Sequence, residues 1–169
     1  MKKNKAVFLD RDGTINKNFG YVFQKEKFIF LKNAINAIKF LKNNGYKVIV
    51  VTNQSGVARG FFKLEDVKKL HDWVNLKLKK KGVKIDKFYV STYHPRFSKQ
   101  KNQSHLRKPN PGMLIKAQKD FSIDFSQSFM IGDSKSDKLA AKKVNLIFIR
   151  KKQNLLACAK QGLKRILKT

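Results

Sequence analysis

Apolar residues along the chain form five short runs, separated by longer segments in which apolar positions recur at helical spacing. The runs are rich in Val, Ile and Phe and cover residues 6–9, 47–51, 87–92, 128–131 and 146–149. Short apolar runs bounded by polar residues and glycine are typical of buried strands. The pattern therefore predicts five strands.

The segments between and after these runs carry apolar residues three or four positions apart, as amphipathic helices do. This spacing predicts helices over residues 31–44, 64–80, 111–120 and 155–167, and a short one that ends at Val144. Asn44 and Gly45 suit the end of the first helix, and Pro111 suits the start of the third. Residues 96–110 lack periodicity and are expected to form a long loop.

Strands and helices alternate throughout this pattern, without a linker, an internal repeat or a low-complexity tract. Such alternation predicts an α/β fold with a parallel, doubly wound, Rossmann-like sheet. A chain of 169 residues is long enough for one sizeable core. We expect residues 1–169 to form a single domain.

Polar side chains cluster where the predicted strands end and at the end of the long loop. The pairs are Asp10 with Asp12, Thr52 with Asn53, Arg107 with Lys108, and Asp133 with Asp137. Open α/β sheets bind ligands at the carboxyl ends of their strands. We therefore expect these four pairs to meet at one edge of the sheet.

The composition predicts a folded protein without a membrane segment. Hydrophobic residues make up 41% of the chain, and the longest apolar runs are far too short to span a bilayer. Asp10 and Asp12 interrupt the apolar run that follows the basic first residues, so we expect no signal peptide. The lone cysteine, Cys158, excludes an internal disulfide and favours the reducing cytoplasm. Cys158 itself is expected to be a small buried apolar residue.

The formal net charge of +28 suggests one alternative function, a basic nucleic-acid-binding module. Only six of the 39 basic residues are arginine, and the remaining 33 lysines are spread along the whole chain. Arginine is the better ligand for phosphates and base edges, so its scarcity weakens this alternative. The positive field would also attract a small anionic substrate.

Asp10 and Asp12 suit nucleophilic and acid–base catalysis. In this interpretation, Asp10 attacks phosphorus to form an aspartyl-phosphate, while Asp12 protonates the leaving alcohol and then deprotonates water. Asp and Gly are also common turn residues, so the Asp-x-Asp-Gly pattern alone could merely terminate a strand.

The other pairs supply what else phosphoryl transfer requires. Asp133 together with Asp10 would hold Mg²⁺, which prefers carboxylates and water as ligands. Thr52 and Asn53 can donate hydrogen bonds to phosphate oxygens, and Lys108 supplies a compact positive charge.

These motifs resemble those of the haloacid dehalogenase superfamily of phosphatases, in the same order. The four superfamily motifs match Asp10 to Thr14, Thr52-Asn53, Lys108, and Gly132 to Asp137. The longer stretches DRDGTIN at 10–16, VTNQSGVARG at 51–60 and RKPNPGM at 107–113 are similar to the heptose-bisphosphate and histidinol-phosphate phosphatase branch. The resemblance covers roughly residues 6–149.

The resemblance implies the superfamily fold with minimal cap loops and a magnesium-dependent phosphatase activity. The implied substrate is a small phosphorylated sugar, foremost the 7-phosphate of D-glycero-D-manno-heptose 1,7-bisphosphate, with histidinol phosphate as the alternative. A monomeric, cytoplasmic enzyme is expected, without a membrane or nucleic-acid partner.

The resemblance also implies roles for individual residues. Asp10 becomes the nucleophile and Asp12 the proton donor, while Thr52 and Lys108 stabilise the transferring phosphoryl group. Magnesium is assigned to Asp10, Asp12 and Asp133, with help from the backbone carbonyl of Arg11. Arg107 resembles a clamp for a second phosphate. The residues expected to contact substrate are Asn18, Phe19, Gly20, Tyr21, Asn53, Gln54, Ser55, Arg107 and Ser134.

Two departures from the branch are visible. The heptose branch usually has a zinc loop, but the matching positions here are Ser91, Tyr93, Ser104 and Leu106. None of these is a good zinc ligand, so we predict no zinc and a more mobile loop over residues 96–104. Ser134 occupies a position that is usually lysine, which removes positive charge near the substrate.

The sequence leaves the role of Asp137 open and favours no catalytic role for His71. Asp137 could bind or orient the metal site, or it could complement the first turn of its helix. His71 fits a partly exposed helix position better than a ligand position.

Overall fold

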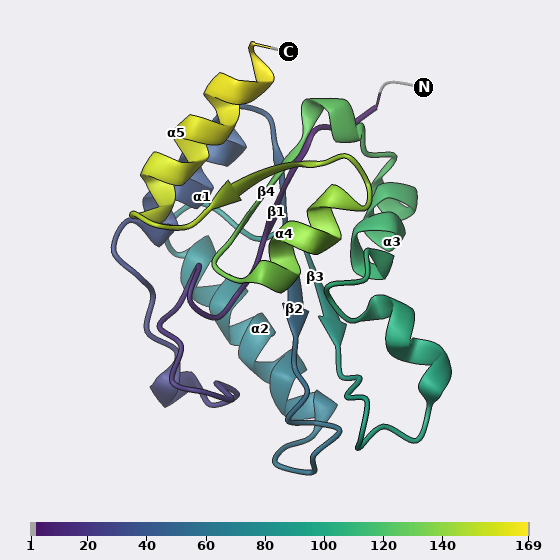
Figure 1. Cartoon of the computed structure of the whole chain (residues 1–169). Helices are drawn as coiled ribbons and strands as arrows, with labels where there is room; N and C mark the ends of the chain where they lie inside the picture. The colour runs from purple at the N-terminus through teal and green to yellow at the C-terminus, as the bar shows by residue number, and fades with distance from the viewer. Residues whose placement is uncertain (1–2, 169) are drawn as a thin grey trace.

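The computed structural model describes residues 3–168 and contains one five-stranded sheet with helices on both faces (Figure 1). The strand order is β3-β2-β1-β4-β5, and all four neighbouring pairs are parallel. The strands are β1 (Ala6–Leu9), β2 (Lys47–Asn53), β3 (Lys87–Ser91), β4 (Phe129–Gly132) and β5 (Ile147–Arg150). The predicted doubly wound sheet is confirmed, with each strand end within two residues of its expected place.

Five α-helices occupy the places that the apolar spacing predicts. They are α1 (Ala34–Asn43), α2 (Leu64–Lys79), α3 (Gly112–Phe121), α4 (Lys135–Lys142) and α5 (Leu155–Ile166). Helix α1 starts later than predicted because Asn33 has a left-handed backbone, φ 63°, which a right-handed helix does not accept. Gly45, at φ 76°, follows the end of α1 as expected.

The sequence predicts a long loop without regular structure over residues 96–110, but the structure contains a short helix there. This is the 3₁₀ helix η2 (Lys101–Leu106), and two shorter 3₁₀ helices are η1 (Lys25–Lys27) and η3 (Phe125–Gln127). A 3₁₀ helix of this length needs no apolar stripe, so the periodicity of the sequence does not reveal it.

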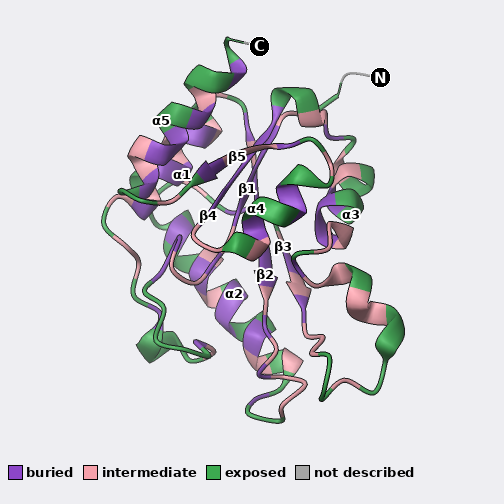
Figure 2. Ribbon diagram, in the orientation of Figure 1, coloured by how far each residue is buried: buried purple, intermediate pink, exposed green. Residues whose placement is uncertain are grey.

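The two layers of helices pack on opposite faces of the sheet, because successive strand residues point to opposite sides. In β1, Val7 and Leu9 join the core formed with α1, α2 and α5, whereas Ala6 and Phe8 join the core formed with α3 and α4. Both faces of the central strands are therefore buried (Figure 2). Cys158, fully buried in α5, belongs to the first of these cores, as predicted.

Because the sheet is parallel, the strands all end at the same edge, where their loops emerge together (Figure 1). The backbone amide of Asp10 still donates to the carbonyl of Ile131 in β4, so Asp10 continues the ladder one residue beyond β1. Between residues 3 and 168, no helix has both the length and the apolar character needed to cross a membrane.

Candidate active site

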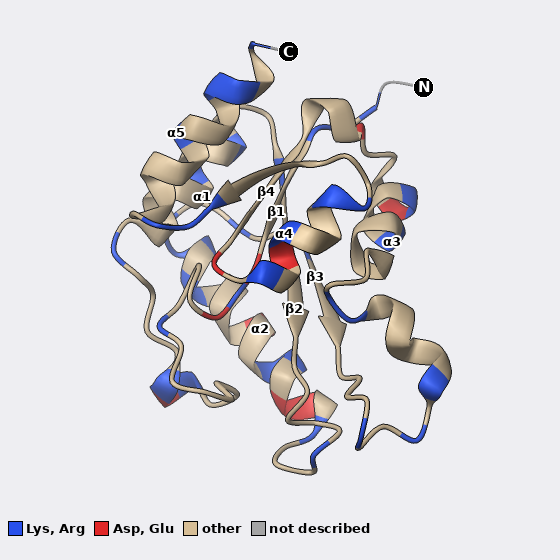
Figure 3. Cartoon of the chain, in the orientation of Figure 1, with Lys and Arg blue, Asp and Glu red and all other residues tan. Residues whose placement is uncertain are grey.

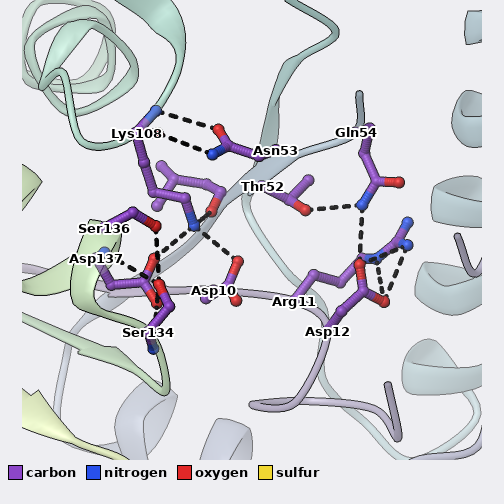
Figure 4. Close-up of polar contacts among 11 residues, drawn as sticks. Asp10, Arg11, Asp12, Thr52, Asn53, Gln54, Lys108, Ser134, Ser136 and Asp137 are labelled. Carbon is purple, nitrogen blue, oxygen red and sulfur yellow. Dashed lines mark hydrogen bonds and ion pairs between the residues drawn. The ribbon is translucent and has the colours of Figure 1, made fainter. Parts of the chain in front are cut away.

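A cleft of about 290 Å³ lies at the carboxyl edge of the sheet. It brings together most of the residues predicted from the four motifs (Figure 4). The lining consists of Asp10, Asp12, Asn18, Tyr21, Thr52, Asn53, Gln54, Ser55, Lys108, Asp133, Ser134 and Ser136. Three residues expected to contact substrate, Phe19, Gly20 and Arg107, are not part of this lining.

One side of the cleft is a carboxylate cluster formed by Asp10, Asp133 and Asp137. One carboxylate oxygen from each residue lies within 4.8 Å of the others. The ammonium group of Lys108 lies between two of them, 2.7 Å from an oxygen of Asp10 and 2.7 Å from one of Asp137. One cation for three carboxylates leaves an excess of negative charge. Since all the ligand atoms are oxygens, the cluster can hold a hard divalent cation.

The ionisation of the cluster reflects this crowding. Burial raises the pKa of Asp10 to about 6, and Asp137 adds to this shift while Lys108 opposes it. Burial and Asp137 also raise the pKa of Asp133. Burial by itself would lower the pKa of Lys108, but the carboxylates of Asp10 and Asp137 outweigh it and raise that pKa. A second cation would relieve the repulsion among the carboxylates.

The backbone passes close to the cluster at two glycines. At Gly13, where φ is 81°, a Cβ atom would lie 2.0 Å from an oxygen of Asp133. At Gly132, a Cβ atom would lie 2.5 Å from an oxygen of Asp137. Gly13 therefore makes room for a carboxylate from the loop after β4, and Gly132 makes room for the carboxylate of Asp137 in its own motif.

On the other side of the cleft, the carboxylate of Asp12 is surrounded by donors. The guanidinium group of Arg11 approaches both of its oxygens, at 3.0 and 2.9 Å. Asn16 donates to one oxygen and Gln54 to the other, both at 2.9 Å. The Gln54 amide also donates to the hydroxyl of Thr52 at 2.9 Å and so links Asp12 to Thr52 (Figure 4).

Two expectations about the metal can be compared with the structure. The carboxylate of Asp12 faces Arg11, Asn16 and Gln54 and lies outside the cluster, in which Asp137 stands instead. The backbone carbonyl of Arg11 accepts the amides of Thr14, Ile15 and Asn16, so it points into the turn. The carbonyl of Arg11 is thus not placed as expected, whereas the assignment of Asp12 to the metal stays a prediction.

The contacts of Asp137 fit both of the roles that the sequence left open. It is fully buried, and its carboxylate accepts the backbone amide and the hydroxyl of Ser134 at the start of α4, at 3.0 and 2.7 Å. Its other oxygen pairs with Lys108 in the cluster. Asp137 thereby caps its helix and holds the ammonium group of Lys108 beside Asp10.

Several lining residues use their polar groups to hold one another. The Asn53 side chain donates to the backbone carbonyl of Lys108 at 3.0 Å and accepts the Lys108 amide at 3.1 Å. The Lys108 ammonium also donates to the carbonyl of Val51 at 2.8 Å, which gives each of its three N–H bonds an acceptor. Thr52 accepts from Gln54, and its own hydroxyl proton has no acceptor among the described residues.

Arg107 directly precedes Lys108, near the end of the segment 96–110, and lies beside the cleft. It donates to the backbone carbonyl of Tyr93 at 3.0 Å. Arg59 pairs with His94 at 2.9 Å and covers the ring of Phe97, 4.8 Å from its centroid. These contacts hold the loop where the heptose branch usually has zinc. The absence of zinc and the greater mobility of residues 96–104 stay predictions.

His71 is buried against Arg11, whereas the sequence favoured a partly exposed position for it. His71 is only 5% exposed, and its ring nitrogen Nε2 lies 3.1 Å from a guanidinium nitrogen of Arg11. The signal was present in the spacing, since His71 lies three and four positions from Val74 and Val67 on the buried side of α2.

Comparison with known proteins places these observations in a family. A family model described as polynucleotide kinase 3 phosphatase matches residues 5–155. The D-glycero-beta-D-manno-heptose-1,7-bisphosphate 7-phosphatase of Photorhabdus laumondii is 46% identical over 138 residues, which are 80% of this chain and 73% of that protein. The enzyme of the same name from Helicobacter pylori is 43% identical over 155 residues, which are 89% and 87% of the two chains.

A relative from Burkholderia mallei is named for the alpha form of the same substrate and is 44% identical over 137 residues, 80% of this chain and 72% of that protein. Among solved structures, the D,D-heptose 1,7-bisphosphate phosphatase of B. bronchiseptica, complexed with magnesium and phosphate, superposes with a TM-score of 0.81 at 25% identity. The match covers 95% of this chain and 99% of that one. The chain therefore belongs to the haloacid dehalogenase superfamily of phosphatases, in the family that contains these heptose-bisphosphate 7-phosphatases.

Proposed function

We propose that this protein is a magnesium-dependent phosphatase that removes the 7-phosphate of D-glycero-D-manno-heptose 1,7-bisphosphate. The observation that carries the proposal is the pairing of two unlike carboxylates in one cleft. Asp10 lies in a cation-binding cluster, and Asp12 is held by hydrogen-bond donors. The names of relatives that are 41–46% identical support the choice of substrate.

In the proposed reaction, a carboxylate oxygen of Asp10 attacks phosphorus, and the bond from phosphorus to the sugar oxygen breaks. Asp12 donates a proton to that oxygen, which leaves as the alcohol. Asp12 then takes a proton from water, whose oxygen attacks the same phosphorus. Inorganic phosphate leaves, and the carboxylate of Asp10 is restored.

The residues around the two carboxylates would hold the phosphoryl group and a metal ion. Thr52 can donate its hydroxyl proton to a phosphate oxygen. The three N–H bonds of Lys108 already have acceptors, so Lys108 contributes its positive charge. Asp10 and Asp133 would hold Mg²⁺, which when bound supplies positive charge to the phosphate oxygens. The backbone carbonyl of Asp12 accepts no backbone amide among residues 3–168, so we assign this group to the metal as well.

The substrate-binding side is proposed to begin at Asn18, Tyr21, Gln54 and Ser55, which line the cleft. Arg107 would hold the second phosphate from the rim. Burial and the nearby Arg59 lower the pKa of Arg107, and no carboxylate among the described residues forms an ion pair with either arginine. Unpaired arginines beside a cleft attract a phosphate.

The family model's description suggests a rival substrate, a polynucleotide that ends in a 3′-phosphate. Figure 3 shows Lys and Arg scattered over helices, strands and loops along the whole described chain, which argues against it. Histidinol phosphate stays the other small-molecule rival. A monomer in the reducing cytoplasm, consistent with the free, buried Cys158, completes the proposal.

Phosphate release from a panel of substrates tests the function. The panel contains both anomers of the heptose bisphosphate, histidinol phosphate and an oligonucleotide with a 3′-phosphate, each with magnesium or with EDTA. The highest kcat/KM is expected for a heptose bisphosphate, with loss in EDTA and in Asp10→Asn. Faster turnover of the oligonucleotide or of histidinol phosphate would overturn the substrate assignment.

A further inference from the structure

The largest completely buried side chain of the described residues is a charged one, that of Arg11. Its guanidinium group donates to the Asp12 carboxylate, to the backbone carbonyl of Val22 and towards His71. Burying a guanidinium group without acceptors would be strongly unfavourable, so each of these partners matters for its position.

The third partner of the Arg11 guanidinium group is His71. It lies in α2, and its ring stacks on that of Phe88 in β3, with centroids 4.1 Å apart and planes 12° apart. Because guanidinium N–H groups only donate, the Nε2 atom of His71 must accept, which places the ring proton on Nδ1. Burial and the charge of Arg11 lower the pKa of His71 to about 3, so the ring stays neutral at physiological pH.

We propose that His71 is a positioning residue for proton transfer, which holds Arg11 so that Arg11 holds the carboxylate of Asp12. The path runs from His71 Nε2 to one guanidinium nitrogen at 3.1 Å, and from the other nitrogen to the two Asp12 oxygens at 3.0 and 2.9 Å. This inference rests on the acid–base role proposed for Asp12.

The planar guanidinium group explains why an acceptor on one side matters for the other. Both terminal nitrogens turn together, so a rotation that restores a hydrogen bond on the His71 side removes one on the Asp12 side. Asn16 and Gln54 would still hold Asp12, so the carboxylate is displaced and not released. A displacement of about 1 Å at a reacting group can lower a rate by about 10²-fold.

Two variants separate positioning from packing. His71→Gln keeps an acceptor near the place of Nε2, and His71→Phe keeps the ring on Phe88 but removes the acceptor. Each is assayed on the heptose bisphosphate, on glycerol phosphate and on p-nitrophenyl phosphate. The p-nitrophenolate ion leaves without protonation, so kcat/KM for this substrate depends little on the acid.

For His71→Phe, we expect kcat/KM to fall by about 10- to 100-fold on the two alkyl phosphates and by less than about threefold on p-nitrophenyl phosphate. His71→Gln should stay within about threefold of the wild type on all three, by keeping the hydrogen bond. An equal loss on all three substrates in His71→Phe would show a merely structural residue and overturn the proposal.

The same experiment distinguishes this inference from the proposed function. A wild type that hydrolyses glycerol phosphate or p-nitrophenyl phosphate but not the heptose bisphosphate refutes the substrate and leaves the His71 comparison intact. Crystal structures of both variants give a test without activity. Arg11 should turn away from Asp12 in His71→Phe and stay in place in His71→Gln, and an unchanged Arg11–Asp12 pair in His71→Phe would overturn the proposal.

Discussion

Asp10 and Asp12 are two residues apart in the sequence but lie in opposite surroundings. Asp10 shares its site with Asp133 and Asp137, and Lys108 pairs with Asp10 and Asp137. Among residues 3–168, Asp12 belongs to no such carboxylate cluster, and it accepts hydrogen bonds from Arg11, Asn16 and Gln54. The comparison teaches that the environment, and not the residue type, divides the labour between two carboxylates.

The difference suits the two proposed roles. A nucleophile that attacks a phosphate dianion needs cations close by, and an acid–base residue needs a fixed orientation towards the oxygen that it serves. The cation-seeking cluster and the donor-lined Asp12 therefore form two halves of one cleft (Figure 4). Four measurements test this division of roles.

The largest effect is expected from substituting the two carboxylates themselves. Asp10→Asn should lower kcat/KM by at least about 10³-fold on both the heptose bisphosphate and p-nitrophenyl phosphate, since the nucleophile is lost. Asp12→Asn should lower it by about 10²- to 10⁴-fold on the sugar phosphate and much less on the aryl phosphate. Steady-state phosphate release measures both. Equal profiles for the two variants would contradict the division.

The second effect concerns the backbone that makes room for the cluster. Gly13→Ala places a Cβ atom 2.0 Å from an Asp133 oxygen, so the metal site should be distorted and activity should fall by about 10²-fold. Gly82→Ala is a matched control, because Gly82 has a similar φ of 79° and no atom within 4 Å of the added Cβ.

Both glycine variants should lose about 1 kcal/mol of stability to backbone strain, since neither alanine fits a positive φ well. Urea unfolding measures this common loss, and phosphate release measures the difference. Activity that falls equally in both would place the effect of Gly13 in folding and not in the cluster.

The third test uses metal binding without turnover. Adding Mg²⁺ at about 100 times its Kd should stabilise the wild type by about 2.7 kcal/mol, seen as a higher Tm. Asp133→Asn removes a cluster carboxylate and should abolish most of this rise. Gln54→Met removes a hydrogen-bond donor to Asp12 and leaves the cluster carboxylates unchanged, so the rise in Tm should be retained. If the rise in Tm is lost in Gln54→Met and kept in Asp133→Asn, the metal binds on the Asp12 side of the cleft and the assignment is wrong.

The smallest effect concerns pH and the buried support of Asp12. The folded pKa of His71, about 3, lies below its ordinary value of 6.5, so between these values the unfolded chain binds a proton that the folded protein does not. The contribution of His71 to the free energy of unfolding therefore falls as pH falls, by up to about 1.4 kcal/mol per pH unit. Between pH 6 and 4.5, the wild type should lose about 2 kcal/mol more than His71→Gln in urea unfolding.

The raised pKa of Asp10 acts in the opposite direction over part of this range, since the folded protein then binds the extra proton. This contribution is common to the wild type and His71→Gln and cancels in their difference. Parallel pH profiles for the two proteins would show that His71 is not kept neutral by burial.

The strands, the helices and the edge at which the motifs meet could be predicted from the amino-acid sequence alone. Apolar runs and helical spacing report which side of each element is buried, and they are local properties of the chain. Parallel strands then bring the residues that follow them to one edge, whatever their separation in sequence. Asp10, Thr52 and Asp133 could therefore be placed together before the structure was known.

The directions in which the polar side chains at that edge point depend on contacts between distant parts of the chain. Lys108 reaches Asp10 across 98 positions, and His71 reaches Arg11 across 60, so no local pattern encodes either contact. The exclusion of the Asp12 carboxylate from the cluster, and its replacement there by Asp137, depend on the same long-range partners. Hydrogen bonds are directional and compete for acceptors, and that competition is settled only when all the loops are in place.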